Sequence, residues 1–134
     1  MSVKIKVGMT VLVSSGPNLS LQREMEVDAY DSIEATIKAG ATDVKIGLQP
    51  GELKEIQLLL VTADPYDSKV TYTVDDGAAA AAPASSAVAL DQPHLLLGGG
   101  AVGLLGKAPK ALHFGNTTAK DVTVRVLVGR KATA

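Results

Sequence analysis

The chain has 134 residues, of which 46% are hydrophobic and 20% charged, and this composition is typical of a folded domain with a modest core. Its formal net charge is −1 and it contains no basic block, which excludes the electrostatic footprint of a nucleic-acid-binding protein. It has no cysteine, which excludes disulfides, thiol catalysis and thiolate-bound metals and suits folding in a reducing cytoplasm. Aromatic residues make up only 3%, too few for the stacking platforms that bind sugars or single-stranded nucleic acids.

The first residues alternate between apolar and basic side chains. Val3, Ile5 and Val7 are separated by lysines, and this period of two predicts a strand. The lysines also interrupt any secretory signal, and no apolar run reaches the about 18 residues of a membrane-spanning helix, so we expect no membrane partner. A second interpretation is that residues 1–18 form an arm that docks on a neighbouring subunit, and the sequence leaves strand and arm open.

Strand patterns continue through the middle of the chain. Residues 19–30 fit a strand period better than a helix period, and shorter alternating segments follow them. The run 56–61 is almost wholly apolar, which predicts a strand buried on both faces. Residues 75–86 are rich in alanine without an amphipathic face, so we interpret them as a surface connection.

An apolar, glycine-rich segment occupies residues 95–106. Its composition indicates a loop rather than a long regular element, and an exposed loop of this kind would be adhesive. Burial between subunits would explain the segment, and packing on its own domain is the alternative. In the first case the candidate subunit-interface residues are Leu95, Leu96, Leu97, Val102, Leu104 and Leu105.

The most regular strand pattern lies near the end of the chain. Valine recurs at every second position from 122 to 128, so one face of the strand is uniformly apolar. We expect residues 69–74 to form its neighbouring strand. The segments 62–74 and 114–126 share a strand end, a polar turn and a Val-Thr pair, which we interpret as two similar hairpins.

These patterns add up to about eight or nine short strands, separated by turn signals roughly every 8 to 12 residues, with no long helix. One apolar and one polar face per strand is typical of antiparallel sheets. The sequence therefore predicts an all-β fold, an antiparallel β-sandwich or jelly roll of about eight strands, in a single domain over residues 1–134.

No arrangement of residues points to catalysis or to a cofactor. A G-x-G-x-x-G pattern in the glycine-rich segment matches a dinucleotide fingerprint only formally, because later glycine and proline residues prevent the long helix that must follow. His94 and His113 lack a patterned third ligand, and the turn-forming acids lack the spacing of a calcium loop. Glycosylation sequons at Asn18 and Asn116 carry no weight without a secretory signal. We expect a non-enzymatic protein without metal or cofactor.

Residues 36–64, which include the turn AGATD and the run LLL, resemble small virion proteins of tailed bacteriophages, as do residues 69–74. Those proteins end on a Phe-x-Asn motif and an alternating-valine strand that closes with Val-Gly. Phe114 to Asn116 and Val126 to Gly129 correspond to these features. The resemblance covers about half of the chain, and its motifs are structural, so no functional residue can be carried over.

The resemblance implies a capsid decoration (cement) protein of jelly-roll or β-sandwich fold, or a related tail component. Such a protein would be made in the host cytoplasm, assemble as a homotrimer on the outer capsid surface of the virion, and clamp neighbouring subunits of the major capsid protein. In that setting Val3, Ile5 and Val7 are the candidate capsid-contacting residues of the arm. The alternative is a tail- or surface-associated sandwich that recognises a carbohydrate or a receptor.

Overall fold

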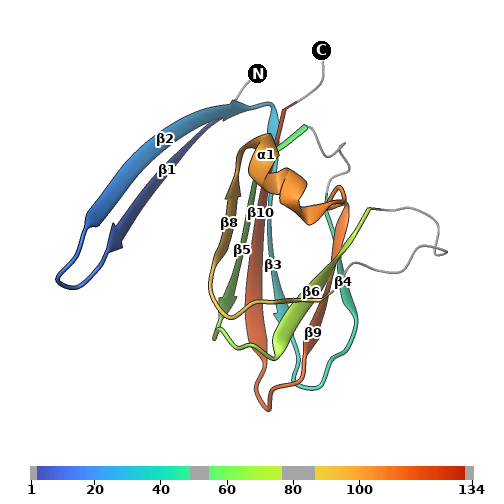
Figure 1. Ribbon diagram of the computed structural model, residues 1–134. Helices are drawn as coiled ribbons and strands as arrows, with labels where there is room; N and C mark the ends of the chain where they lie inside the picture. The colour runs from blue at the N-terminus through green and yellow to red at the C-terminus, as the bar shows by residue number, and fades with distance from the viewer. Residues whose placement is uncertain (1–2, 49–54, 77–86, 132–134) are drawn as a thin grey trace.

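The computed structural model describes residues 3–48, 55–76 and 87–131, and Figure 1 shows a two-layer sandwich from which a long hairpin projects. One layer, sheet I, has four strands in the order β3 (Ala29–Ile37), β10 (Val122–Arg130), β5 (Ile56–Asp64) and β8 (His94–Leu97). The other layer, sheet II, has four strands in the order β4 (Val44–Gly47), β9 (Ala111–Asn116), β6 (Val70–Asp75) and β7 (Val88–Ala89). The surface connection predicted for residues 75–86 falls mostly on 77–86, which lie outside the described residues.

The strands pair in a nested order. β3 pairs with β10, β4 with β9, β5 with β8 and β6 with β7, always antiparallel. A long hairpin folded over into two sheets produces this order, which is the jelly-roll connection. The prediction of an all-β antiparallel sandwich or jelly roll is therefore confirmed.

The nested order corrects two expectations about the closing strand. β10 pairs with β3 and β5, whereas β6 lies in the opposite sheet and pairs with β9 and β7. The similar segments 62–74 and 114–126 are not hairpins, because each crosses from one sheet to the other. Local alternation predicts strands and their faces, but it carries no information about which strands become neighbours.

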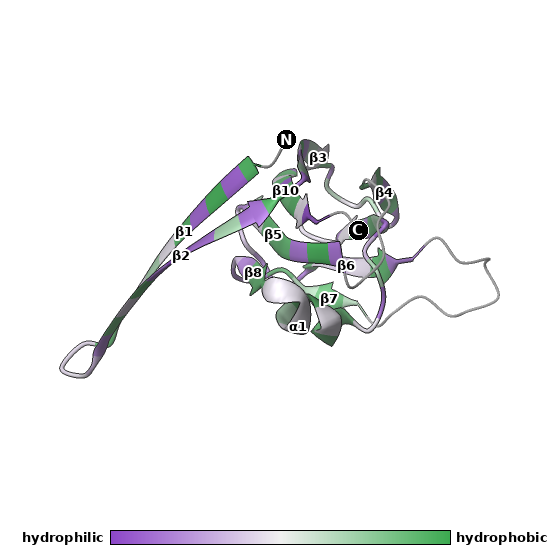
Figure 2. Ribbon diagram, turned by 90° about the horizontal axis from the view of Figure 1, so that it is seen from above, coloured by the Kyte–Doolittle hydropathy of each residue, from purple (hydrophilic) through white to green (hydrophobic). Residues whose placement is uncertain are grey.

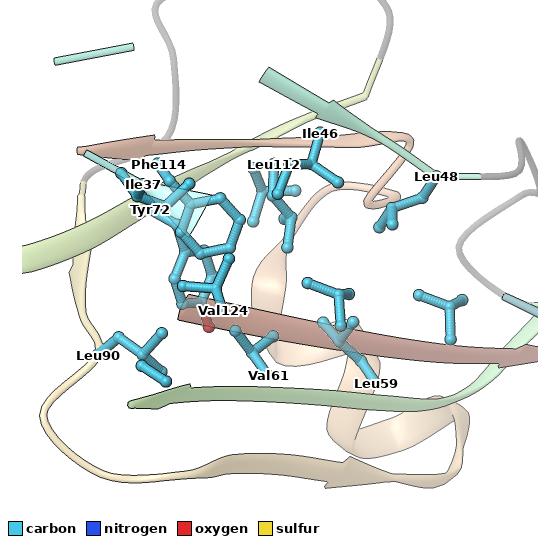
Figure 3. Packing of buried hydrophobic residues seen from close by; sticks show 14 of the residues in the cluster. Ile37, Ile46, Leu48, Leu59, Val61, Tyr72, Leu90, Leu112, Phe114 and Val124 are labelled. Carbon is cyan, nitrogen blue, oxygen red and sulfur yellow. The ribbon is translucent and has the colours of Figure 1, made fainter. Parts of the chain in front are cut away.

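The hydrophobic core lies between the two sheets. The valines at every second position of β10 are all buried there, as their period of two predicts. Figure 3 shows Tyr72 and Phe114 side by side in this core, with ring centroids 5.6 Å apart and the rings tilted against each other. Leu58 and Leu59 are consecutive in β5 and both are 1% exposed, so the strand predicted at 56–61 is covered on both faces at this point, whereas Leu60 on the outer face is only partly buried.

The glycine-rich segment is more regular than its composition suggests. Gly98–Val102 form helix α1, and Gly103–Leu105 form the 3-10 turn η2 directly after it. Gly98 has a φ of +86°, a conformation that favours glycine, and it turns the chain from β8 into the helix. Val102 is fully buried in the core, so the segment closes one end of the sandwich instead of forming a surface loop (Figure 1).

The N-terminal residues form the first strand of a long hairpin that projects from the sandwich. β1 (Val3–Leu12) and β2 (Asn18–Val27), each of 10 residues, pair antiparallel along their whole length. Seen from above in Figure 2, this hairpin extends well beyond the sandwich, and we call it the arm. The strand predicted for residues 19–30 is confirmed for most of its length, but it belongs to the arm rather than to the sandwich.

Candidate interaction surface

The arm has one apolar face and one polar face. Its register places Ile5 opposite Met25, and directly opposite residues of an antiparallel pair share a face. Arg23 is the one charged residue on this face, which otherwise consists of Val3, Ile5, Val7, Met9, Val11, Leu19, Leu21, Met25 and Val27. The other face carries the lysines and glutamates of both strands, including an exposed ion pair of 3.7 Å between Lys4 and Glu24.

The base of the apolar face packs on the outer surface of sheet I. Val27 and Leu58 are each 1% exposed, although neither belongs to the core between the sheets. Gly129 of β10 lies beneath the arm, where an added Cβ would sit 3.1 Å from Ile5 Cδ1 and 3.3 Å from Val27 Cγ1. The missing side chain at Gly129 lets the arm approach the sheet closely, and this contact anchors it.

The apolar side chains become more exposed toward the tip of the arm. Along the apolar face Val7 and Met9 are partly buried, whereas Leu21 is 44%, Val11 is 56% and Leu19 is 64% exposed. A two-stranded hairpin is only marginally stable in water, and clustered exposed apolar side chains mark a contact surface. The outer half of the arm is therefore the strongest candidate interaction surface in the described part of the chain.

A second apolar surface lies beside the arm, on the outer face of sheet I. Leu58 and Leu60 of β5 are paired with Leu97 and Leu95 of β8, and Leu60 is paired on its other side with Leu127 of β10. Apart from Leu58, these side chains are only partly buried. An open groove of about 660 Å³ separates this outer patch from the arm, and it is lined by Met9, Leu21, Arg23, Glu24, Met25, Leu97 and Gly98.

The predicted interface residues of β8 divide between the two faces of sheet I. Leu95 and Leu97 belong to the outer patch, and Leu97 borders the groove beside the arm. Leu96, between them, points inward and packs against the core. Alternation within a strand separates the three residues, so no single surface can present all of them.

The remaining predicted interface residues lie in α1 and η2. Val102 is fully buried and Leu105 packs against the core, so both hold the segment on its own domain. Leu104 projects outward and is 82% exposed. The packing of Val102 and Leu105 agrees with a segment that packs on its own domain, while the place of the exposed Leu104 in a subunit interface stays a prediction.

The predicted arm residues lie on the apolar face of the arm. Val3, Ile5 and Val7 occupy its base and middle, where the chain itself partly covers them. The most exposed members of this face, Val11 and Leu19, were not predicted as contacts. Their signal is present in the sequence, because both continue the alternation on either side of a loop that contains Gly16 and Pro17.

His113 of β9 is held between two carboxylates on the outer face of sheet II. Its Nδ1 lies 2.6 Å from Asp43 Oδ1 and its Nε2 lies 2.8 Å from Asp75 Oδ2. The hydrogen bonds to Asp75 and, second, to Asp43 raise the pKa of His113 above its ordinary value of 6.5, against a smaller opposing effect of burial. Both ring nitrogens are engaged, so neither is free to act as a base or a metal ligand while these bonds persist.

The other histidine, His94, supports the core. Its Nδ1 shares a hydrogen bond of 2.8 Å with the hydroxyl of Tyr72, and the two rings are 5.6 Å apart. Burial raises the pKa of Tyr72 to about 12, so the phenol stays protonated at neutral pH. This pair satisfies the polar end of a buried ring, which is a structural role.

Asn116 is a buried polar residue with every side-chain hydrogen-bonding position in use. Its Nδ2 donates to the carbonyl oxygens of Ile37 (2.9 Å) and Lys120 (2.7 Å). Its Oδ1 accepts from the backbone N–H (3.0 Å) and the hydroxyl (2.6 Å) of Thr118. The sequon at this position is therefore sealed inside the fold, and the residue fastens the β9–β10 crossover to the end of β3.

Two of the turn-forming acids that were considered as calcium ligands make hydrogen bonds within the fold. Asp67 Oδ1 accepts a hydrogen bond of 2.8 Å from the backbone of Lys69, and Asp75 accepts one from His113. Within residues 3–48, 55–76 and 87–131, no three His, Asp or Glu side chains are placed to hold a metal ion. None of the helices in these same ranges combines the length and the apolarity needed to cross a membrane.

Tyr66 lies between two open polar grooves near one end of the sandwich. One groove, of about 360 Å³, is lined by Glu34, Thr62, Ala63, Asp64, Tyr66, Thr123 and Arg125. The other, of about 550 Å³, is lined by the turns around Tyr66 and Thr117. A single ring with polar neighbours offers less stacking area than a sugar-binding platform normally uses, so we rank this surface below the arm.

Comparisons with known proteins identify no relative. No protein-family model and no curated protein matches the sequence, and no solved structure matches the fold.

Proposed function

We propose that this chain is a non-enzymatic structural protein of a tailed-bacteriophage virion, a capsid decoration (cement) protein that binds the outer shell and stabilises contacts between major capsid protein subunits. The observation that carries the proposal is the arm, because its apolar face continues beyond the sandwich without cover. The jelly-roll order, which recurs among viral capsid proteins, supports it, as does the resemblance of residues 36–64 and of the closing strand to small virion proteins.

A cement protein needs complementary surfaces rather than an active site. Its copies repeat across a lattice, so individually weak contacts act together through a high effective concentration. An arm of 10 residues per strand spans about 33 Å at about 3.3 Å per residue, so it can reach a partner well beyond the sandwich. In a homotrimer several arms would act at once, and the partners are the major capsid protein and further copies of the chain.

The proposal is tested by co-sedimenting the full chain with empty shells of the bacteriophage that encodes it, prepared without decoration. We expect saturable binding at a fixed number of copies per shell, and a higher temperature of shell disruption after binding. An unrelated β-sandwich protein of similar charge serves as the control. Shells that sediment without the protein at saturating concentrations would sink the proposal.

The alternative, a tail- or surface-associated module that recognises a carbohydrate or receptor, has the Tyr66 grooves in its favour. It predicts binding to host-cell envelopes that is lost in Tyr66→Ala and is unaffected by substitutions in the arm. Binding to shells that survives Tyr66→Ala would favour the cement protein.

A further inference from the structure

The apolar face of the arm is longer than the surface that its own chain offers to it. At the base, Ile5 and Val27 pack against Leu58 and Gly129 of sheet I. Farther out, the same face continues through Leu21 to Leu19, where the exposed fraction rises from 44% to 64%. The arm leaves the sandwich before this outer half can be covered (Figure 2).

Sheet I, in turn, has more apolar surface on its outer face than the arm of the same chain covers. Its outer face is apolar at Leu60, Leu95, Leu97 and Leu127, all of them only partly buried. The arm covers this face at Leu58 and then diverges from it, which leaves the groove bordered by Leu97. Each copy thus carries an uncovered apolar ribbon and an uncovered apolar sheet face.

We propose that the partner of the outer half of the arm is a second copy of this chain, with the arm of one copy lying across the outer face of sheet I of the next. The inference deepens the proposed function, since it names the contact that joins subunits of the proposed homotrimer. Because the arm and the sheet patch are different surfaces, the contact is head-to-tail, and it closes when the copies form a ring.

The packing of the arm on sheet I within one copy indicates how the arm would pack on sheet I of the next copy. At the base, the apolar face of the arm already lies so close to the outer face of sheet I that a Cβ at position 129 would sit 3.1 Å from Ile5 Cδ1. The proposed contact repeats this pairing of the same two faces farther along each of them.

The charges agree with this arrangement. The polar face of the arm, with its exposed Lys4–Glu24 ion pair, would remain in water when the apolar face is covered. Arg23 is the one charge that the contact would enclose, and a buried charge needs an opposite charge. The groove on the outer face of sheet I beyond Leu60 offers the carboxylate of Asp64, whereas the carboxylate of Glu34 in the same groove already pairs with Arg125 at 3.3 Å.

The first test compares two substitutions that add the same charge at adjacent positions of β2. Leu21→Glu places it on the apolar face, and Gln22→Glu places it on the polar face. Light scattering after size exclusion, over a range of concentrations, gives the association constant. We expect the wild-type chain and Gln22→Glu to form the same oligomer, and Leu21→Glu to associate about tenfold or more weakly with an unchanged circular dichroism spectrum.

The second test uses the absence of cysteine from the chain. Leu19→Cys and Leu95→Cys are made as separate variants, mixed under oxidising conditions, and compared with each variant alone. We expect the mixture to yield a disulfide between the two variants in clear excess over either homodimer, because the tip of one arm lies near sheet I of another copy.

Three results would overturn the inference: a monomer at all concentrations, an oligomer that tolerates Leu21→Glu, or an oligomer that dissociates only in Leu104→Glu, which would place the interface on η2. A monomer that still binds capsid shells would overturn this inference alone and leave the proposed function standing. An oligomer joined by the arm that binds no capsid shell would overturn the proposed function and leave this inference standing.

Discussion

At the scale of single residues, two polar side chains tie together elements that are distant in the sequence. Asn116 fastens the β9–β10 crossover to the carbonyl oxygen of Ile37, and His113 joins Asp43 at the start of β4 to Asp75 at the end of β6. Both residues are polar positions within β9, which otherwise buries Ala111, Leu112 and Phe114. Their contributions to stability can be separated, because only the contribution of His113 depends on pH.

We expect Asn116→Ala to lower the free energy of unfolding by about 3 kcal/mol, because it leaves buried carbonyl and N–H groups without partners. Urea denaturation with an unchanged m-value is the measurement. Thr117→Ala is the matched control: this neighbouring residue is exposed, and its hydroxyl makes only a long hydrogen bond of 3.4 Å. A loss no larger than that of the control would contradict the role of Asn116.

The raised pKa of His113 predicts that the free energy of unfolding falls as the pH rises. Its pKa is raised in the folded state, so its contribution is fully present below the unfolded value of about 6.5 and is lost as the pH passes through the raised folded pKa. Urea titrations at a series of pH values should show this decline, and His113→Gln should remove it.

An NMR titration of the His113 ring gives the cause of the shift. The hydrogen bond to Asp75 contributes more than the one to Asp43, so Asp75→Asn should lower the pKa of His113 further than Asp43→Asn does. Equal titration curves in the wild type and in both variants would show that neither carboxylate raises the pKa of His113.

At the scale of elements, the arm depends on one close approach. We expect Gly129→Val to destabilise the protein by about 1–3 kcal/mol and to loosen the base of the arm, because the new methyl groups would enter space held by Ile5 and Val27. Faster proteolytic cleavage within residues 3–27 would report the loosening.

Gly8→Ala provides the comparison within the arm. A Cβ at Gly8 meets nothing within 4 Å, and alanine restricts the unfolded chain more than glycine does. The free energy of unfolding of Gly8→Ala should therefore stay level or rise slightly. If Gly129→Val behaves like Gly8→Ala, the arm does not pack on the sheet as described.

At the scale of the whole molecule, β10 contacts both neighbouring strands of sheet I, the core and the arm. It lies between β3 and β5, its valines form one wall of the core, and its Gly129 receives the arm. Loss of this strand would remove the central contact of sheet I and leave β3 and β5 without a common neighbour.

We expect Val124→Asp to abolish folding, because Val124 is fully buried and a carboxylate there would have no partner. Circular dichroism and the melting temperature are the measurements. Arg125→Ala changes the next residue on the exposed face and removes only a surface ion pair of 3.3 Å with Glu34, so it should cost less than about 1 kcal/mol. A soluble Val124→Asp variant with the wild-type melting temperature would refute the face assignment.

Most strands and the faces they present could be predicted from local patterns in the sequence. Alternation identified β2 and β10, because side chains of a strand point to opposite sides whatever the strand pairs with, and the continuous apolar run at 56–61 identified β5. The sequence also marked two apolar regions as candidates for association, the N-terminal residues and the leucines of β8. Composition was a poorer guide at 98–106, where burial of Val102 makes a helical turn of a segment rich in glycine.

Only the tertiary structure decided which strands are neighbours and which apolar residues remain outside. Val102 and Leu104 are nearly alike in the sequence, yet one is fully buried and the other is 82% exposed. The exposed tip of the arm and the outer patch of sheet I also emerge only when the chain is folded. The physical reason is that pairing and burial depend on contacts between residues far apart in the sequence, whereas the period of a strand is a property of its own backbone.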